Sequence, residues 1–333
     1  MGISTLSQQE LIAQVKRERR LRNRLWAYFK SLVSNWTALL GLIIIVSFYS
    51  IAIFADVVAP YHPTQDDYTE GLDSFQEPLT PSTGPSSLPV SIWNLLSVQF
   101  PHLLGTDRWG QDVFSRIIFG SRNAVMAGFI AVTVGMFGGI ILGAVSGYFG
   151  GTVDNIIMRI VDAWMSIPSF FMLLIIVAAL SEQPWNPGGR YTLLIAMFFS
   201  GFMWIPSLAR LFRGTVLSVR EMDFIDAARA TGASETRIIG KHILPNVFPI
   251  VLVYATMGIG GAILTTSGLS FIGLGARPNE PDWGGDLNTN RSSFRSFWWT
   301  TFFPGLAIFI VVLGFNLLGD WLRDVLDPRT RDV

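Results

Sequence analysis

The chain contains no cysteine and only three histidines. Without cysteine, disulfide bonds, thiol nucleophiles and cysteine metal ligands are all excluded. The histidines lie far apart in the sequence, at His62, His102 and His242, so a histidine metal centre is not expected. No set of nucleophile, base and orienting residue is apparent either, which leaves enzymatic activity without a basis.

Charged residues are scarce, at 14% of 333 residues, where a soluble domain carries about 25%. Half of the residues are hydrophobic, and the net charge is zero, so there is no bulk electrostatic case for binding nucleic acid. The few charges are clustered, which leaves long uncharged runs. These runs predict an all-α polytopic membrane protein.

Six stretches are long and apolar enough to cross a bilayer, which takes about 20 residues. They are Trp36–Ala55, Asn123–Val153, Ala163–Ser181, Tyr191–Ala209, His242–Ala276 and Ser296–Gly319. As a single helix the fifth would be about 50 Å long, too long for a straight span. We therefore expect its second half, TTSGLSFIGLG (265–275), to form a bend or a short re-entrant element.

Lys and Arg are distributed unevenly between the connections. Placing both termini in the cytoplasm puts 17 of the 24 cationic residues on that side, as the positive-inside rule requires. The expected domains are then a cytoplasmic basic amphipathic segment (1–35), the first transmembrane helix (36–59), an extracytoplasmic loop (60–120), a transmembrane core (121–320) and a cytoplasmic tail (321–333). The basic segment is either a helix on the anionic lipid surface or a solvated arm that only sets topology.

Glycine recurs at every fourth position of the second predicted span, at Gly135, Gly139, Gly143, Gly147 and Gly151. This spacing makes a groove along one helix face, which lets another backbone approach closely. We predict tight helix packing along Gly135–Gly147, with the last one or two of the five glycines already in a turn.

A polar connection of about 216–245 separates the fourth and fifth predicted spans, and it contains DAARATGASETRIIGKHILPN (226–246). Gly232 can end a helix formed by the preceding residues, because glycine adopts the left-handed conformation cheaply. Ser234 is positioned to cap the next helix, and Pro245 suits the first turn of the fifth span. The sequence predicts a helix, a sharp turn and a second helix. Small side chains would keep this bend slim enough to dock on another protein; the alternative is an amphipathic connector on the membrane surface.

DAARATG followed by Leu-Pro resembles the EAA motif of bacterial ABC importer permeases: Glu-Ala-Ala, three residues, Gly, nine residues, Ile, one residue, Leu-Pro. The spacing matches throughout, although Asp226 replaces the usual Glu and His242 the usual Ile. Four further stretches resemble the dipeptide/oligopeptide/nickel permeases of this group: HLLGTDRWGQDVFSRIIFGSR (102–122), SGYFGGTVDNIIMRIVDAWMSIPSFFMLL (146–174), LSFIGLGARPNEPDWG (269–284) and GDWLRDVLDPR (319–329). The resemblance covers about residues 35–330 and is greatest to the second, six-span permease subunit.

The resemblance implies the fold of a type I ABC importer permease in a prokaryotic inner or plasma membrane. In that family two permeases form the pathway, two cytoplasmic ATPases drive it, and an extracytoplasmic binding protein delivers the cargo. The coupling residues carried over by the motif are Arg220, Glu221, Met222, Asp223, Phe224, Asp226, Ala227, Ala228 and Gly232. The surface around Gly105–Arg122 and Arg277–Asp286 would meet the binding protein.

No phosphate loop of the form G-x-x-x-x-G-K-[ST] is present, so this chain is not expected to be an enzyme or to hold a cofactor. ATP and Mg are expected on the partner ATPases. Peptides are the expected cargo, with nickel chelates or other small solutes as the alternative. A self-contained secondary transporter would show inverted repeats and ionisable residues at the membrane midplane, and neither is evident. A membrane anchor without transport activity is the third class of function.

Overall fold

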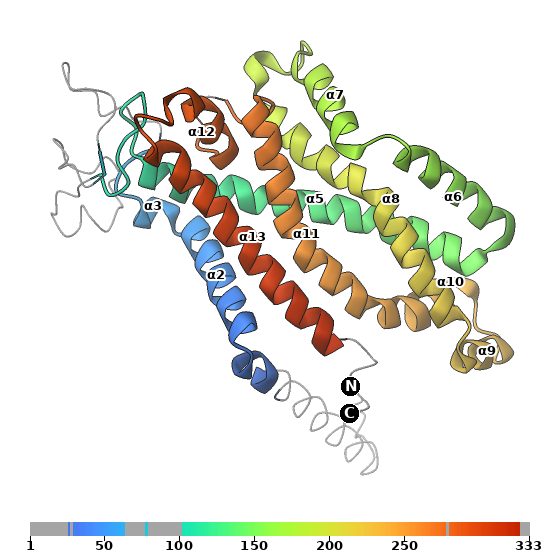
Figure 1. Cartoon of the computed structure of the whole chain (residues 1–333). Coiled ribbons are helices and arrows are strands. Elements are labelled where there is room, and N and C mark those ends of the chain that lie inside the picture. Colours follow the sequence, from blue (N-terminus) through green and yellow to red (C-terminus); the bar gives the residue numbers. More distant parts are fainter. Residues whose placement is uncertain (1–25, 27–28, 64–76, 79–101, 278–279, 327–333) are drawn as a thin grey trace, which may run out of the picture.

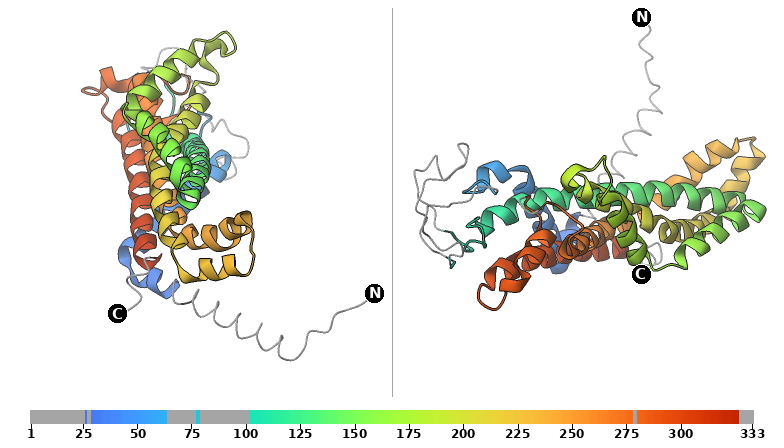
Figure 2. Two further views of the ribbon diagram at one scale, coloured as in Figure 1. Left: turned by 90° about the vertical axis from the view of Figure 1, so that its right-hand side faces the viewer. Right: turned by 90° about the horizontal axis from the view of Figure 1, so that it is seen from above.

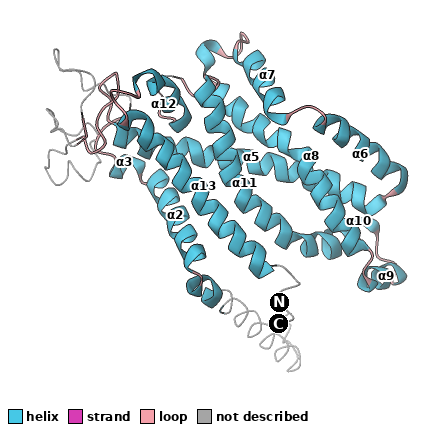
Figure 3. Ribbon diagram, in the orientation of Figure 1, coloured by secondary structure: helices cyan, strands magenta, loops and turns pink. Residues whose placement is uncertain are grey.

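Long apolar helices make up most of the computed structural model, which describes residues 26, 29–63, 77–78, 102–277 and 280–326 (Figure 1). Among these residues an isolated β-bridge pairs Thr106 with Asp112, His102 also takes part in a bridge, and the rest of the ribbon is helix and short connections (Figure 3). Most of the predicted segment 1–35 and of the predicted loop 60–120 lies outside the described residues.

Five helices are long and apolar enough to cross a membrane. They are α2 (Trp36–Ile53), α5 (Val113–Phe149), α8 (Thr192–Arg220), α11 (Leu244–Ile272) and α13 (Trp299–Leu326). Polar caps set where the first two begin: the Asn35 side chain accepts from the backbone N–H groups of Thr37 and Ala38, and the Asp112 carboxylate from that of Ser115. All five correspond to predicted spans, which confirms an all-α polytopic membrane protein.

The third predicted span is not one straight helix, contrary to expectation. The predicted range, Ala163–Ser181, covers only the end of α6 (Gly151–Met165) and all of α7 (Ser169–Ser181), and these two helices are bent by 77° at the break between them. Pro168 lies in that break; proline has no N–H to continue a helix, and it disfavours helical geometry in the residue before it. The six predicted spans are therefore five continuous helices and one bent pair.

The second predicted span ends earlier than expected: α5 ends at Phe149, whereas the prediction extended to Val153. Gly150 and Gly151 adopt positive φ angles of 65° and 54°, which lets the chain turn sharply into α6. Gly151 therefore lies in the turn, as predicted.

The fifth span contradicts the expected bend at 265–275, since α11 stays helical to Ile272 and ends at Gly273, where φ is 98°. The hydroxyls of Thr265 and Thr266 bond carbonyls one turn back in the same helix, so these polar residues fit into it. The excess length lies at the other end, where α11 is continuous with two short helices over Glu235–Ile272.

The short elements complete the fold and gather at the two ends of the bundle. They are α3 (Ala55–Val58), η1 (Pro187–Gly189), α9 (Asp223–Ala230), α10 (Glu235–Ile238), the π-helical turn η2 (Ile239–Ile243), α12 (Trp283–Asn290) and η3 (Arg291–Ser293). α9 and α10 project at the same end as the start of α2 and the end of α13 (Figures 1 and 2). α3 and α12 lie at the opposite end.

Candidate functional site

The connection between α8 and α11 forms a projecting elbow, which we define as residues 220–245. α9 ends in a Schellman motif: the N–H of Ala233 bonds the carbonyl of Ala228, and the N–H of Gly232 bonds that of Arg229. Gly232 has a φ of 78°, so the predicted glycine stop is confirmed. Pro245 lies in the first turn of α11, also as predicted.

The capping prediction for Ser234 is only half correct. Ser234 occupies the N-cap position of α10, but its hydroxyl makes no capping bond and lies 3.4 Å from the hydroxyl of Thr236. Glu235 is in the first turn as expected, yet its carboxylate bonds a distant side chain rather than the helix end. The local pattern located the helix start without identifying these partners.

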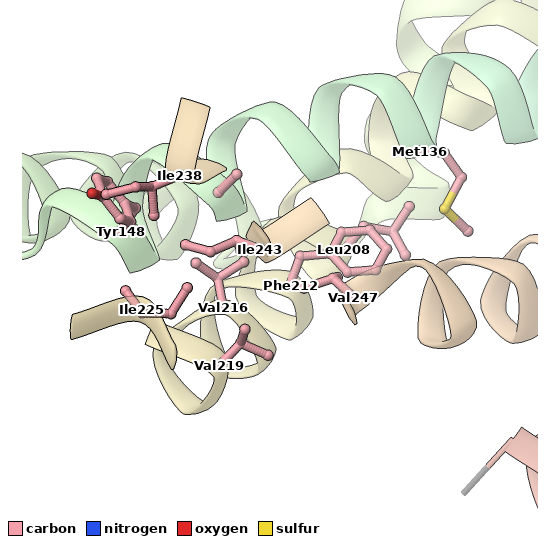
Figure 4. Close-up of a cluster of buried hydrophobic side chains, with 11 residues drawn as sticks. Met136, Tyr148, Leu208, Phe212, Val216, Val219, Ile225, Ile238, Ile243 and Val247 are labelled. Carbon is pink, nitrogen blue, oxygen red and sulfur yellow. The ribbon is translucent and has the colours of Figure 1, made fainter. Parts of the chain in front are cut away.

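Three isoleucines anchor the elbow to the bundle. The side chains of Ile225, Ile238 and Ile243 are fully buried in a cluster that also contains Phe212 and Val216 of α8 (Figure 4). Each fully buried side chain of this type contributes about 2 kcal/mol, so the elbow is packed onto α8 rather than loosely tethered. Sequence reasoning missed these three anchors, although their apolar side chains stand out in a polar connection.

Tyr148, near the end of α5, is the polar anchor of the elbow. Its phenol donates a hydrogen bond to the carboxylate of Glu235, and its carbonyl accepts one from Nη1 of Arg220 at 3.0 Å. The guanidinium of Arg229 lies 5.8 Å from the centre of its ring, within range of a cation–π contact. The elbow is thus fixed to α5 as well as to α8, and Tyr148 was not among the predicted site residues.

The outer surface of α9 is largely exposed. The predicted coupling residues that are exposed to solvent in this region are Glu221, Met222, Asp223, Phe224, Asp226, Ala227 and Gly232. Met222 and Phe224 expose 45% and 40% of their surface. Exposed apolar residues that lie among carboxylates are typical of a protein contact surface.

The small residues of the motif line a hollow and do not form a slim convex tip. Ala227, Ala228 and Gly232 face a space of about 530 Å³ whose opposite wall is formed by Arg237 and Lys241, among others. The predicted coupling residues on and after α9 therefore form an exposed face on α9 and one wall of a cationic hollow between α9 and η2, and Phe224 belongs to both.

The four predicted packing glycines lie along the contact between α5 and α8. All four are buried. A Cβ added to Gly135 would lie 3.1 Å from the Gly201 carbonyl, one on Gly143 would lie 2.8 Å from that of Ala209, and one on Gly147 would lie 2.8 Å from that of Arg213. A Cβ on Gly139 would overlap Leu208. The glycine face of α5 therefore holds the backbone of α8 at close range, one turn after another.

Ion pairs hold α6 against α8. The guanidinium of Arg213 donates two hydrogen bonds of 2.5 Å to the carboxylate of Asp154, which Ser146 also contacts. Arg210 pairs with Asp162.

A second polar cluster lies at the opposite end of the bundle, where α5 begins. Arg116 is almost completely buried, and its Nε donates to the Asp286 carboxylate at 3.0 Å. Its Nη1 donates to the side chain of Gln111 at 2.5 Å and to the Pro63 carbonyl at 3.1 Å. One cation thus joins α5, α12 and the segments before α5.

The acidic groups of this cluster outnumber its arginine. Burial raises the pKa of Asp107 to about 6, opposed by nearby Arg116 and by two backbone N–H groups. Burial also raises the pKa of Asp282 to about 6. The Asp286 pKa is likewise raised by burial, opposed by its pairing with Arg116. Three carboxyl groups thus share one buried guanidinium, and we expect the stability of this cluster to depend on pH.

The surface expected to meet a binding protein is smaller than predicted. Much of Gly105–Arg122 and Arg277–Asp286 is buried, since the two segments pack against each other. The described residues that remain exposed there are Arg108, whose guanidinium stacks 4.1 Å from the Trp109 ring, and Arg277, which pairs with Glu280. The cluster therefore serves mainly to hold the bundle end together.

Two family models match the chain. One, described as a binding-protein-dependent transport system inner membrane component, matches residues 139–332 and so includes the elbow. The other, described as the N-terminal TM domain of oligopeptide transport permease C, matches residues 24–78.

Curated relatives extend over nearly the whole chain. The dipeptide transport system permease protein DppC of Alkalihalophilus pseudofirmus is 40% identical over 91% of this chain and 89% of its own length. DppC of Haemophilus influenzae is 37% identical over 92% of this chain and 94% of its own length. The glutathione transport system permease protein GsiD of Pectobacterium atrosepticum is 36% identical over 95% of both chains.

A solved structure of the MetNI methionine ABC transporter, titled as an inward-facing conformation, shares the fold with a TM-score of 0.51. The match covers 63% of this chain and 96% of that chain at 19% identity, so it concerns the fold alone. By its family models, relatives and helical architecture, this chain belongs to the binding-protein-dependent transport system inner membrane components and has the permease fold of type I ABC importers.

Proposed function

We propose that this chain is one of two permease subunits of an ATP-driven peptide importer, and that its elbow receives the work of a partner ATPase. The observation that carries the proposal is the elbow itself: a projecting bend, exposed on α9, yet packed onto α5 and α8 through Tyr148 and the three buried isoleucines. A push on α9 reaches two spanning helices directly, because interior packing transmits displacement.

The elbow lies in the cytoplasm in this proposal, together with both termini. The excess of Lys and Arg in the connections at that end supports this orientation. ATP and Mg are then held by two ATPase subunits, and a binding protein meets the opposite end. A prokaryotic inner or plasma membrane is the corresponding location.

Short peptides are the proposed cargo. The relatives named for dipeptides and the relative named for glutathione share this chemistry. This cargo assignment is tested by measuring dipeptide uptake by the complete assembly in proteoliposomes. ATP is supplied on the side of the membrane where the ATPases lie. Uptake of another solute class in place of peptides would overturn the cargo assignment.

Replacing Ala228 tests the coupling site. Ala228 is half-buried in the hollow, so Ala228→Glu fills it with a charged side chain. We expect loss of ATPase retention in a pull-down and at least tenfold slower ATP-driven uptake. Ala230→Glu is the matched control, because Ala230 is exposed on the same helix and does not line the hollow. If Ala228→Glu leaves both retention and uptake unchanged, the elbow is not the coupling site.

A further inference from the structure

An open cavity of about 590 Å³ lies between helices of the bundle, lined by residues of α5, α7, α8, α11 and α13. It is separate from the elbow and from the buried arginine cluster. None of the described residues that line it is Asp, Glu, Lys, Arg or His. Because no charged residue lines this cavity, recognition of a solute there would depend on uncharged groups.

Besides Ser169 at the start of α7, uncharged polar side chains from three helices line this cavity: Ser207 of α8, Tyr254 of α11 and Asn316 of α13. Ser207 is exposed, and the other two are half-buried. Ser200 and Thr265 also line it, but their hydroxyls bond carbonyls of their own helices. Within the described residues, no such bond is formed by the side chains of Ser207, Tyr254 or Asn316.

These three side chains lie at a similar depth. Tyr254 is about ten residues after the start of α11, and Asn316 is about ten residues before the end of α13. At 1.5 Å per residue, both are about 15 Å from the elbow end of the bundle. Ser207 is about 20 Å from the end of α8 by the same measure. Polar groups without partners are costly in hydrocarbon, so this level of the cavity favours water and polar solutes.

Trp204 forms a wall of the same cavity. Its indole occupies space left by two glycines: a Cβ on Gly135 of α5 would lie 3.1 Å from its ring, and a Cβ on Gly258 of α11 would overlap it. The ring is therefore held between α5 and α11, one turn of α8 before Ser207. Its position limits the width of the cavity at the level of the polar side chains.

We infer that this cavity is the part of the peptide path contributed by this chain, and that Ser207, Tyr254 and Asn316 contact the peptide groups of the cargo while Trp204 limits its width. The inference rests on the proposed importer function. A hydroxyl and an amide side chain can donate to a peptide carbonyl and accept from a peptide N–H. They recognise what all peptides share, and without an ion pair to the termini the cargo is readily released.

The natural absence of cysteine makes the inference directly testable. Ser207→Cys, Asn316→Cys and the control Thr256→Cys are made singly in the complete assembly. Thr256 lies two residues after Tyr254, so it points to a different side of α11; its hydroxyl bonds its own helix, and it does not line the cavity. A charged, membrane-impermeant methanethiosulfonate reagent is applied to vesicles of both orientations, and modification of this subunit is followed by mass spectrometry.

We expect the cysteines at 207 and 316 to be modified at least tenfold faster than the one at 256, and a dipeptide to slow this reaction. Equal, slow modification of all three would overturn the inference, and so would protection by a non-peptide solute alone. Wild-type uptake is measured in the same vesicles. If wild-type vesicles do not take up peptide, the proposed function fails; if they do while positions 207 and 316 stay unreactive, only this inference fails.

Uptake kinetics distinguish the proposed peptide contact of Asn316 from the proposed role of Trp204 in limiting the width of the cavity. Asn316→Leu keeps the side-chain size but removes the hydrogen-bonding groups, so we expect a several-fold loss of dipeptide uptake with ATPase retention unchanged. Trp204→Ala should admit longer peptides relative to dipeptides, whereas Trp204→Phe should retain the wild-type ratio. An unchanged length preference in Trp204→Ala would refute the width role.

Discussion

Tyr148 and Glu235 join the end of α5 to the start of α10 through a hydrogen bond between phenol and carboxylate. The bond connects a spanning helix to the elbow, although α6, α7, α8 and α9 lie between the two residues in the sequence. Together with the buried isoleucines, it makes the elbow part of the α5–α8 unit.

Removing the hydroxyl of Tyr148 should loosen the elbow without displacing the aromatic ring. Tyr148→Phe loses one hydrogen bond, which contributes about 1 kcal/mol. We expect faster hydrogen exchange in residues 223–240 and several-fold lower ATP-driven uptake, with normal membrane insertion. Tyr191→Phe, at the other end of α8, is the control. Unchanged exchange in Tyr148→Phe would show that the isoleucine cluster alone holds the elbow.

The turn at Gly232 should not tolerate a β-branched residue. Its φ is 78°, and an added Cβ would meet no atom of this chain within 4 Å, so Gly232→Val strains the backbone without a clash inside the elbow. That strain amounts to about 2 kcal/mol. Uptake should fall strongly while insertion is intact, and Gly232→Asn should retain more activity because Asn tolerates this conformation. Equal activity of the two variants would argue against a requirement for the left-handed turn.

Packing of α5 against α8 should fail when Gly143 is enlarged. A Cβ there would already lie 2.7 Å from the Phe212 Cβ, and overpacking of this kind costs about 3 kcal/mol. Gly143→Leu should therefore lower the yield of assembled complex several-fold in size-exclusion chromatography. Gly214→Leu provides the matched control, since Gly214 is exposed on α8 with no atom within 4 Å of an added Cβ. Normal assembly of Gly143→Leu would refute the packing prediction.

The buried cluster at the α12 end should be more stable in mild acid than at neutral pH. Burial raises the pKa of Asp107 and Asp282 from 3.8 to about 6, so the folded state binds these protons more tightly than the unfolded state. The resulting stabilisation is complete below about pH 3.8 and is lost as the pH rises through 6. Hydrogen exchange of residues 102–116, corrected for the intrinsic rate, should show more protection at pH 5 than at pH 7.

Asp107→Asn should weaken that pH dependence. The amide oxygen can still accept from the N–H groups of Trp109 and Gln111, which Asp107 binds at 2.9 Å each, while the buried charge is gone. Asp226→Asn, on the exposed face of the elbow, should leave the dependence unaltered. A pH dependence that is the same in wild type and Asp107→Asn would exclude Asp107 as a source.

Much of the elbow could be predicted because its signals are local. Gly232 ends α9 through its left-handed backbone geometry, and Pro245 fits the first turn of α11, so each can be read from the residue itself. The partners of Glu235 and Ile225 could not be predicted, since they depend on how α9 and α10 fold back onto helices that lie elsewhere in the sequence. For the same reason the motif's small residues were expected on a convex tip, whereas they line a hollow.

Hydropathy is summed along the chain, so the sequence alone was enough to identify the class of protein, the approximate positions of its spanning segments and the face of α5 that carries glycine. Which helix that face meets, how sharply α6 and α7 bend, and where Arg116 finds Asp286 are properties of helices in contact. They were decided only in the tertiary structure, because packing and buried charge depend on neighbours that local residue patterns do not specify.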